Sequence, residues 1–208
     1  MTEDEAQTWL AGRSVPRETL DHVSRFIDLL TKANTEQNLI AASTLPQVWS
    51  RHITDSVQLL DHAPPLGRWV DLGSGPGFPG LMIALFGKHH VDLVESRAKR
   101  VGFLHDAITC LGLDSRVRVL SGRAEAVAAT TYDVISARAF APLPRLFEIG
   151  RRFARADTVW LLPKGRNAAA ELAEAQQKWQ GDFALVPSVT DADSSILIAR
   201  GVAPGRSK

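Results

Sequence analysis

VDLGSGPGFPG, at residues 70–80, is the stretch that decides how the rest of this chain is interpreted. It begins as a short apolar strand, reaches an acid at Asp71 and then turns through four glycines. Glycine reaches positive φ and has no Cβ, so the backbone of such a turn can approach a bound cofactor closely. The pattern is typical of the loop that follows the first strand of a cofactor-binding α/β sheet.

The composition of this loop favours one cofactor over another. Residues 75–80 match G-x-G-x-x-G, and Glu95 follows at the distance where a dinucleotide site keeps its ribose-binding acid, so NAD is one candidate. Pyrophosphate, however, needs N–H donors that Pro76 and Pro79 lack, and Asp71 would repel it. S-adenosylmethionine carries an ammonium and a sulfonium, which an anionic site attracts. We therefore expect S-adenosylmethionine, with a nicotinamide-dependent oxidoreductase as the alternative.

Length and charge narrow the class further. The chain has 208 residues, a net charge of +1 and one cysteine, which excludes an internal disulfide framework. No apolar run approaches the roughly 20 residues that span a bilayer, so we expect a cytoplasmic protein with no membrane contact. Residues 1–70 carry six basic and nine acidic side chains, whereas residues 96–166 carry thirteen and six, a net charge of +7. This central segment is a candidate polyanion-binding surface, although solvated helix faces explain the charges equally well.

The periodicity of apolar residues predicts two parts. Residues 1–62 have helical spacing and are expected to form an N-terminal extension, and residues 204–208 a flexible basic tail. Between them, in residues 63–203, we expect strands at 69–72, 91–94, 117–120, 134–136, 159–162, 183–187 and 195–200. The helices expected there are 79–87, 97–111, 124–129, 143–155 and 167–179. Such alternation predicts a doubly wound, mostly parallel seven-stranded α/β sheet of the Rossmann-like class, with an antiparallel strand at one edge.

Each candidate site residue directly follows one of these strands, where an α/β sheet binds its ligands. Glu95 is suited to accept ribose hydroxyls, or to cap the helix that follows. The Ala124 N–H and the Glu125 carboxylate suit an adenine edge, although an acidic first helical turn is the simpler interpretation. Arg138 and Lys164 suit a phosphate or a guanine edge, although a lone basic residue more often forms a surface ion pair.

Missing motifs limit the chemistry. Cys110 lies in a helical pattern away from the cleft, no Asn/Asp-Pro-Pro-aromatic motif follows the fourth strand, and no His or Cys spacing fits zinc, so no metal is expected. His52 is interpreted as a helix-interface residue. No general base is evident, which suits attack by a lone pair that is already free, such as guanine N7.

The chain resembles the RsmG (GidB) family of bacterial small-subunit ribosomal RNA methyltransferases. The motifs that carry the resemblance occur in order: RHITDS at 51–56, DLGSGPGFPG at 71–80, ES at 95–96, RAE at 123–125, SARA at 136–139 and KG at 164–165. One departure is Ala33, where the family usually has Trp. The resemblance implies methyl transfer from S-adenosylmethionine to N7 of one guanine in the 530 loop of 16S rRNA.

The expected site then divides into two sets of contacts and one positioning residue. The cofactor contacts are Asp71, Gly73, Gly75, Gly77, Phe78, Glu95, Ala124, Glu125 and Arg138. The RNA contacts are Arg97, Lys99, Arg100, Arg123 and Lys164. Arg138 is also expected to position the reactants. The partner is 16S rRNA in the small subunit or its precursor, and a monomer is expected. A small-molecule methyltransferase and a non-catalytic ribosome-assembly factor remain alternatives.

Overall fold

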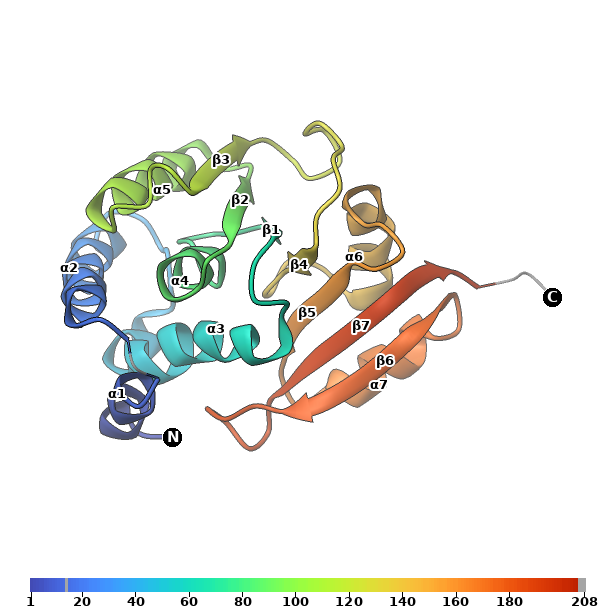
Figure 1. Ribbon diagram of the computed structural model, residues 1–208, viewed down its shortest axis with the longest axis horizontal. Coiled ribbons are helices and arrows are strands. Elements are labelled where there is room, and N and C mark those ends of the chain that lie inside the picture. Colours follow the sequence, from blue (N-terminus) through green and yellow to red (C-terminus); the bar gives the residue numbers. More distant parts are fainter. Residues whose placement is uncertain (14, 206–208) are drawn as a thin grey trace.

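The computed structural model describes residues 1–13 and 15–205. Within them a sheet with strand order β3-β2-β1-β4-β5-β7-β6 runs through the molecule, and helices pack around it (Figure 1). The strands are β1 Arg68–Leu72, β2 His90–Glu95, β3 Val117–Ser121, β4 Val134–Ser136, β5 Val159–Lys164, β6 Trp179–Pro187 and β7 Ser195–Pro204. The seven-stranded Rossmann-like sheet expected from the sequence is therefore confirmed.

The direction of the strands fixes where loops gather. Strands β1 to β5 pair in parallel, whereas β7 runs antiparallel between β5 and β6. Strand β6 consequently runs parallel to β5, and the turn from β6 to β7 lies at the carboxyl ends of the parallel strands. The last two strands are longer than expected: Pro204 still belongs to β7, and the Gly205 N–H donates to the Lys178 carbonyl oxygen at 2.8 Å. The tail expected at 204–208 is wrong for these two residues, and 206–208 lie outside the described residues.

Four helices connect the strands: α4 Gly80–Phe86, α5 Ala98–Cys110, α6 Leu143–Gly150 and α7 Ala168–Ala175. The short turn η4, Arg151–Phe153, extends α6. The helix expected at 124–129 is wrong, because β3 and β4 are joined there by a loop with a single turn that closes on the Arg123 carbonyl oxygen. Only Ala124 of this segment is buried, so no apolar face repays the cost of helix nucleation.

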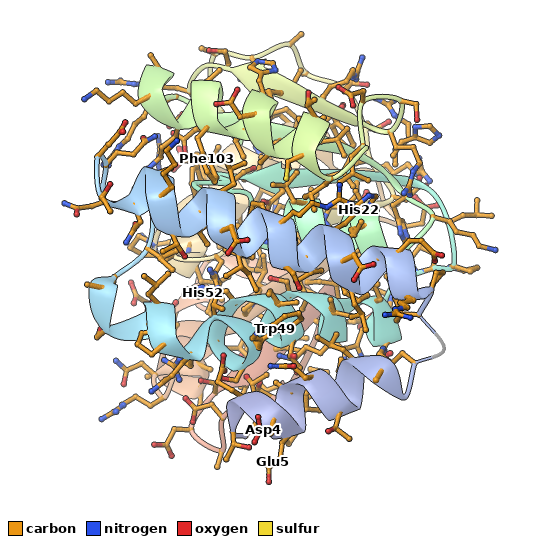
Figure 2. All side chains as sticks on the ribbon, turned by 90° about the vertical axis from the view of Figure 1, so that its left-hand side faces the viewer. Asp4, Glu5, His22, Trp49, His52 and Phe103 are labelled. Atoms are coloured by element: carbon orange, nitrogen blue, oxygen red, sulfur yellow. The ribbon has the colours of Figure 1, made fainter. Side chains whose placement is uncertain are left out.

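The first 62 residues cover one face of the sheet. Helices α1 (Glu3–Ala11) and α2 (Arg17–Asn34) are followed by η1 (Ala42–Gln47), the π-helical turn η2 (Trp49–Thr54), α3 (Asp55–Val57) and η3 (Gln58–His62). In Figure 2 this face is seen directly, with α5, α2, the η2–α3 segment and α1 arranged one below another. Helix α2 buries Val23, Phe26 and Leu30 in one hydrophobic cluster with β2 and α5. No helix in the described part of the chain is long and apolar enough to cross a membrane.

Candidate functional site

The glycine loop between β1 and α4 has one position that faces open space. Gly73, Gly75 and Gly77 all have positive φ, at 70°, 56° and 101°. A Cβ on Gly73 would lie 2.4 Å from the Phe140 ring, and one on Gly77 would lie 2.2 Å from Leu81. A Cβ on Gly75 would meet nothing closer than the Arg100 guanidinium, at 3.7 Å. Gly73 and Gly77 therefore serve packing, whereas Gly75 leaves space that a ligand can use.

The Asp71 side chain connects β1 to β4 and to the start of α4, directly below this loop. Its Oδ1 accepts a hydrogen bond from the Ser136 hydroxyl at 2.7 Å, and its Oδ2 accepts one from the Gly80 N–H at 3.3 Å. The Trp69 indole N–H donates in turn to the Ser136 hydroxyl at 2.8 Å. The side chain is fully buried, and burial raises the pKa of Asp71 to about 6. The carboxylate is buried because β1 is an interior strand of the sheet.

Glu95 at the end of β2 binds the backbone on both sides of the site, in the turn before α5 and in the glycine loop. Its Oε1 accepts the N–H groups of Ser96 and Arg97 at 2.7 and 2.8 Å, and its Oε2 accepts the Gly75 N–H at 3.0 Å. The Arg100 guanidinium lies 3.8 Å from the same Oε2. Arg100 therefore points toward the loop and is only partly exposed, whereas the neighbouring side chains of Arg97 and Lys99 are exposed.

The segment after β3 contains the backbone of Ala124 and Glu125 and an ion pair between Glu125 and Arg145. Ala124 is buried, whereas Arg123 and Glu125 are exposed. The Glu125 Oε1 accepts a hydrogen bond from Arg145 of α6 at 2.8 Å, and Arg152 donates to the Glu125 carbonyl oxygen. The backbone of this turn is thus held in place by arginines from α6 and the turn that follows it, and the Glu125 carboxylate already has a partner.

Arg138, directly after β4, is bound by groups from the N-terminal segment. Its guanidinium donates to His52 Nδ1 at 2.8 Å and to the Arg51 carbonyl oxygen at 3.1 Å, and it lies 3.5 Å from an Asp55 carboxylate oxygen. Burial lowers the pKa of Arg138, and the nearby carboxylates of Asp55 and Asp71 oppose this effect. Sequence reasoning placed Arg138 at this edge but missed Asp55. Two signals point to Asp55: the RHITDS motif at 51–56 contains it, and it lies three residues after His52 in a helical segment.

Phe78 faces away from the loop. Its ring is 3% exposed, stacks on His52 with a centroid distance of 5.1 Å, and meets Phe26 of α2 edge-on at 5.6 Å. The Arg138 guanidinium carbon lies 5.5 Å from the centre of the same ring. The Phe78 side chain therefore joins the glycine loop to α2 and to the Arg138 cluster, and leaves almost no surface for a ligand.

Beyond Arg138 opens a cleft of about 920 Å³ at the carboxyl ends of β4 and β5. Its lining includes Arg51, His52, Asp55, Arg138, Phe140, Lys164, Thr190 and Asp191. Phe140 also contacts Gly73, so the cleft borders the glycine loop. Lys164 is paired with Glu171 at 2.7 Å and is mostly buried. The site thus consists of a glycine loop with anionic groups beside a cleft that contains both cations and carboxylates.

Comparison with known proteins agrees with this geometry. The family model described as GidB, rRNA small subunit methyltransferase G, matches residues 19–197. The "Ribosomal RNA small subunit methyltransferase G" of Rhizorhabdus wittichii is 48% identical over 207 residues, which is 98% of this chain and 95% of the relative. The protein of the same name from Sphingopyxis alaskensis is 47% identical and covers 96% of this chain and 87% of its own.

Solved structures share the fold at low identity. A mutant of MtNAS in complex with S-adenosylmethionine has a TM-score of 0.59 and 18% identity, and the match covers 86% of this chain and 74% of that one. The B. subtilis tRNA methyltransferase TrmK has a TM-score of 0.57 and 16% identity, and the match covers 71% and 65% of the two chains. These structures show the fold, and the family match with the two relatives shows more: the chain belongs to the rRNA small subunit methyltransferase G family.

Proposed function

We propose that this chain transfers a methyl group from S-adenosylmethionine to 16S rRNA of the small ribosomal subunit. The observation that carries the proposal is the pairing of a family-specific glycine loop, open only toward Gly75 among its three positive-φ glycines, with a cleft directly beside it. Family membership supports the methyltransferase activity. We further propose N7 of a guanine in the 530 loop as the acceptor, on the basis of the family resemblance.

The residues around the loop fit S-adenosylmethionine. The space at Gly75 admits a ligand against the backbone, and the adjacent Glu95 carboxylate is suited to accept ribose hydroxyls. The backbone at Ala124 and Glu125 is suited to the adenine edge. Gly73, Gly77 and Phe78 shape the loop, and Asp71 supports it from below. When bound, the cofactor supplies an electrophilic methyl group on a sulfonium.

Arg138 is suited to orient the reactants. Guanine N7 has a free lone pair, so the protein must align it with the methyl group but need not remove a proton. Methylation creates positive charge on the base, which a guanidinium over the ring would oppose. The useful place for Arg138 is therefore on a phosphate, on the cofactor carboxylate or on the guanine O6 edge.

The rRNA partner is supported by exposed basic groups at the same sheet edge. Arg97, Lys99 and Arg123 are exposed there, and Lys164 lines the cleft. We propose that these four side chains and Arg100 contact RNA phosphates or bases. We also propose that residues 63–203 form the methyltransferase domain, that residues 1–62 are an extension that supplies His52 and Asp55 to its cleft, and that the protein acts as a cytoplasmic monomer.

A direct test is methyl transfer to small subunits isolated from a strain that lacks the modification. We expect the purified protein and S-adenosylmethionine to add one methyl group per subunit, found by nucleoside mass spectrometry as 7-methylguanosine in the 530 loop. Isothermal titration should give binding of S-adenosylmethionine and none of NAD. Tighter binding of NAD, or no methyl group on 16S rRNA, would overturn the proposal.

A further inference from the structure

His52 lies between the glycine loop and Arg138 and contacts both. Its Nδ1 is 2.8 Å from the Arg138 guanidinium, its ring stacks on Phe78 of the loop, and its Nε2 is 2.9 Å from the Thr44 hydroxyl. Figure 2 shows it on the segment below α2. We infer that His52 is a positioning residue for methyl transfer, which holds the Arg138 guanidinium in the cleft through the lone pair on Nδ1. This inference rests on the proposed function.

The hydrogen bonds allow only one protonation state of this ring. A guanidinium only donates, so Nδ1 must be the acceptor and carry no proton. The neutral ring then carries its proton on Nε2, which donates to Thr44 Oγ1. The Thr44 hydroxyl hydrogen is used at the Ala41 carbonyl oxygen, 2.8 Å away, so the oxygen is free to accept. The chain of donors runs in one direction, from Arg138 through His52 and Thr44 to Ala41.

Charge in the cluster keeps this state populated. Protonation of Nδ1 would place a second cation and a second donor against the Arg138 guanidinium, with Arg51 nearby. Burial, Arg138 and Arg51 together lower the pKa of His52 to about 3, so the ring remains neutral near pH 7. An Asp55 carboxylate oxygen lies 3.5 Å from the other terminal nitrogen of the Arg138 guanidinium. The guanidinium is thereby fixed between a neutral acceptor and a carboxylate.

The position of His52 relates the two halves of the site. Stacking against Phe78 fixes the ring relative to the glycine loop, and the bond from Arg138 fixes the guanidinium relative to the ring. A reactant held by Arg138 is therefore located with respect to a cofactor held by the loop. Misplacement of reactants by about 1 Å is enough to cost about 100-fold in rate, so a lost bond at this point should be visible in the chemical step.

The test compares His52→Phe with His52→Asn. Phe keeps an aromatic ring against Phe78 but has no acceptor, whereas Asn places an amide oxygen where Nδ1 was. In single-turnover methylation of small subunits we expect His52→Phe to lower the rate about 30-fold, with cofactor affinity and subunit KM within about threefold of wild type. His52→Asn should recover at least a third of the wild-type rate. Equal rates for His52→Phe and wild type would overturn the inference, and so would equal losses for Phe and Asn.

A double-mutant cycle separates positioning from general damage. If His52 acts through Arg138, His52→Phe costs nothing further in an Arg138→Ala background, whereas independent effects multiply. Multiplied losses would refute the inference.

Should His52→Phe not fold, Thr44→Val removes the acceptor of the Nε2 proton, with Thr44→Ser as its matched control. We expect a several-fold slower rate for Val and a near-normal rate for Ser, and equal rates for the two refute the inference. Wild-type protein that does not methylate 16S rRNA would instead refute the proposed function.

Discussion

The two halves of the site differ in how they are built. Around the glycine loop, the carboxylates of Asp71 and Glu95 are satisfied by groups of β4, the start of α4 and the turns after β1 and β2, and the two residues are 0% and 5% exposed. The cleft beside it is lined by side chains from the N-terminal segment, the ends of β4 and β5, and the β6–β7 turn, and it stays open over about 920 Å³. The loop is held by groups of the central strands and the turns that follow them, whereas the cleft also needs contacts between the N-terminal segment and the β6–β7 turn.

The largest effect on cofactor binding at the glycine loop is expected from Gly75→Val. Its side chain would enter the open space at Gly75, so we expect binding of S-adenosylmethionine to weaken at least about 1,000-fold by isothermal titration. Gly201→Val is the matched control, because Gly201 has a φ of 58° and a Cβ added there would meet nothing within 4 Å, so the backbone strain is comparable. Both variants should lose similar thermal stability. Retained binding by Gly75→Val would show that the ligand does not use this space.

In the cleft, the largest loss of methyl transfer is expected from replacing Arg138. We expect Arg138→Ala to lower single-turnover methyl transfer about 100-fold, and Arg138→Lys to recover only part, since a point charge does not replace a planar fork. The Ala variant leaves His52 Nδ1 without a donor and removes the cation beside Asp55, so the melting temperature should also fall by several degrees. Rates are therefore measured well below both melting temperatures. A wild-type rate for Arg138→Ala contradicts the assignment.

The contribution of Asp71, which binds the N-terminal end of α4 below the glycine loop, to protein stability should depend on pH. The pKa of Asp71 is raised to about 6 in the folded protein, against an ordinary value of 3.8, so the native state binds more protons between these values. Its contribution to stability is therefore lost as pH rises from about 4 to 6, by up to about 1.4 kcal/mol per pH unit. Denaturant unfolding of wild type and Asp71→Asn at several pH values tests this. A pH-independent difference between the two would contradict the raised pKa.

The smallest effects are expected at the exposed basic side chains after β2, beside the glycine loop. If Arg97 and Lys99 contact phosphates, each change to Gln should lower the slope of log affinity against log salt by about 0.7 to 0.9. Lys88→Gln is the control, because Lys88 lies just before the opposite end of β2. Subunit binding measured from about 50 to 200 mM salt supplies the slopes. Equal slopes for all three variants and wild type would place the RNA elsewhere.

The difference between local patterns and contacts between distant residues explains which features the sequence could predict. Strands, most helices and the glycine loop follow from apolar periodicity and glycine spacing, which are local properties, and the structure confirms them. The helix at 124–129 was wrong because its pattern lacked a buried face. The side-chain burial of Asp71 and the inward direction of Arg100 depend on neighbours distant in sequence. Likewise, the bond between His52 and Arg138 joins residues 86 apart, and no pattern along the chain encodes it.

The antiparallel direction of β7 has a consequence for how the protein is made. It returns the β6–β7 turn to the cleft, where Thr190 and Asp191 bind Asp55 and Arg51 across 135 and 140 residues. Gln58 also donates to Ser188 at 3.0 Å. The cleft wall therefore closes only when the β6–β7 turn meets the N-terminal segment. A nascent chain still short of this turn can form the glycine loop but has no complete cleft, so competence for catalysis arrives only after residues 188–191 have been made.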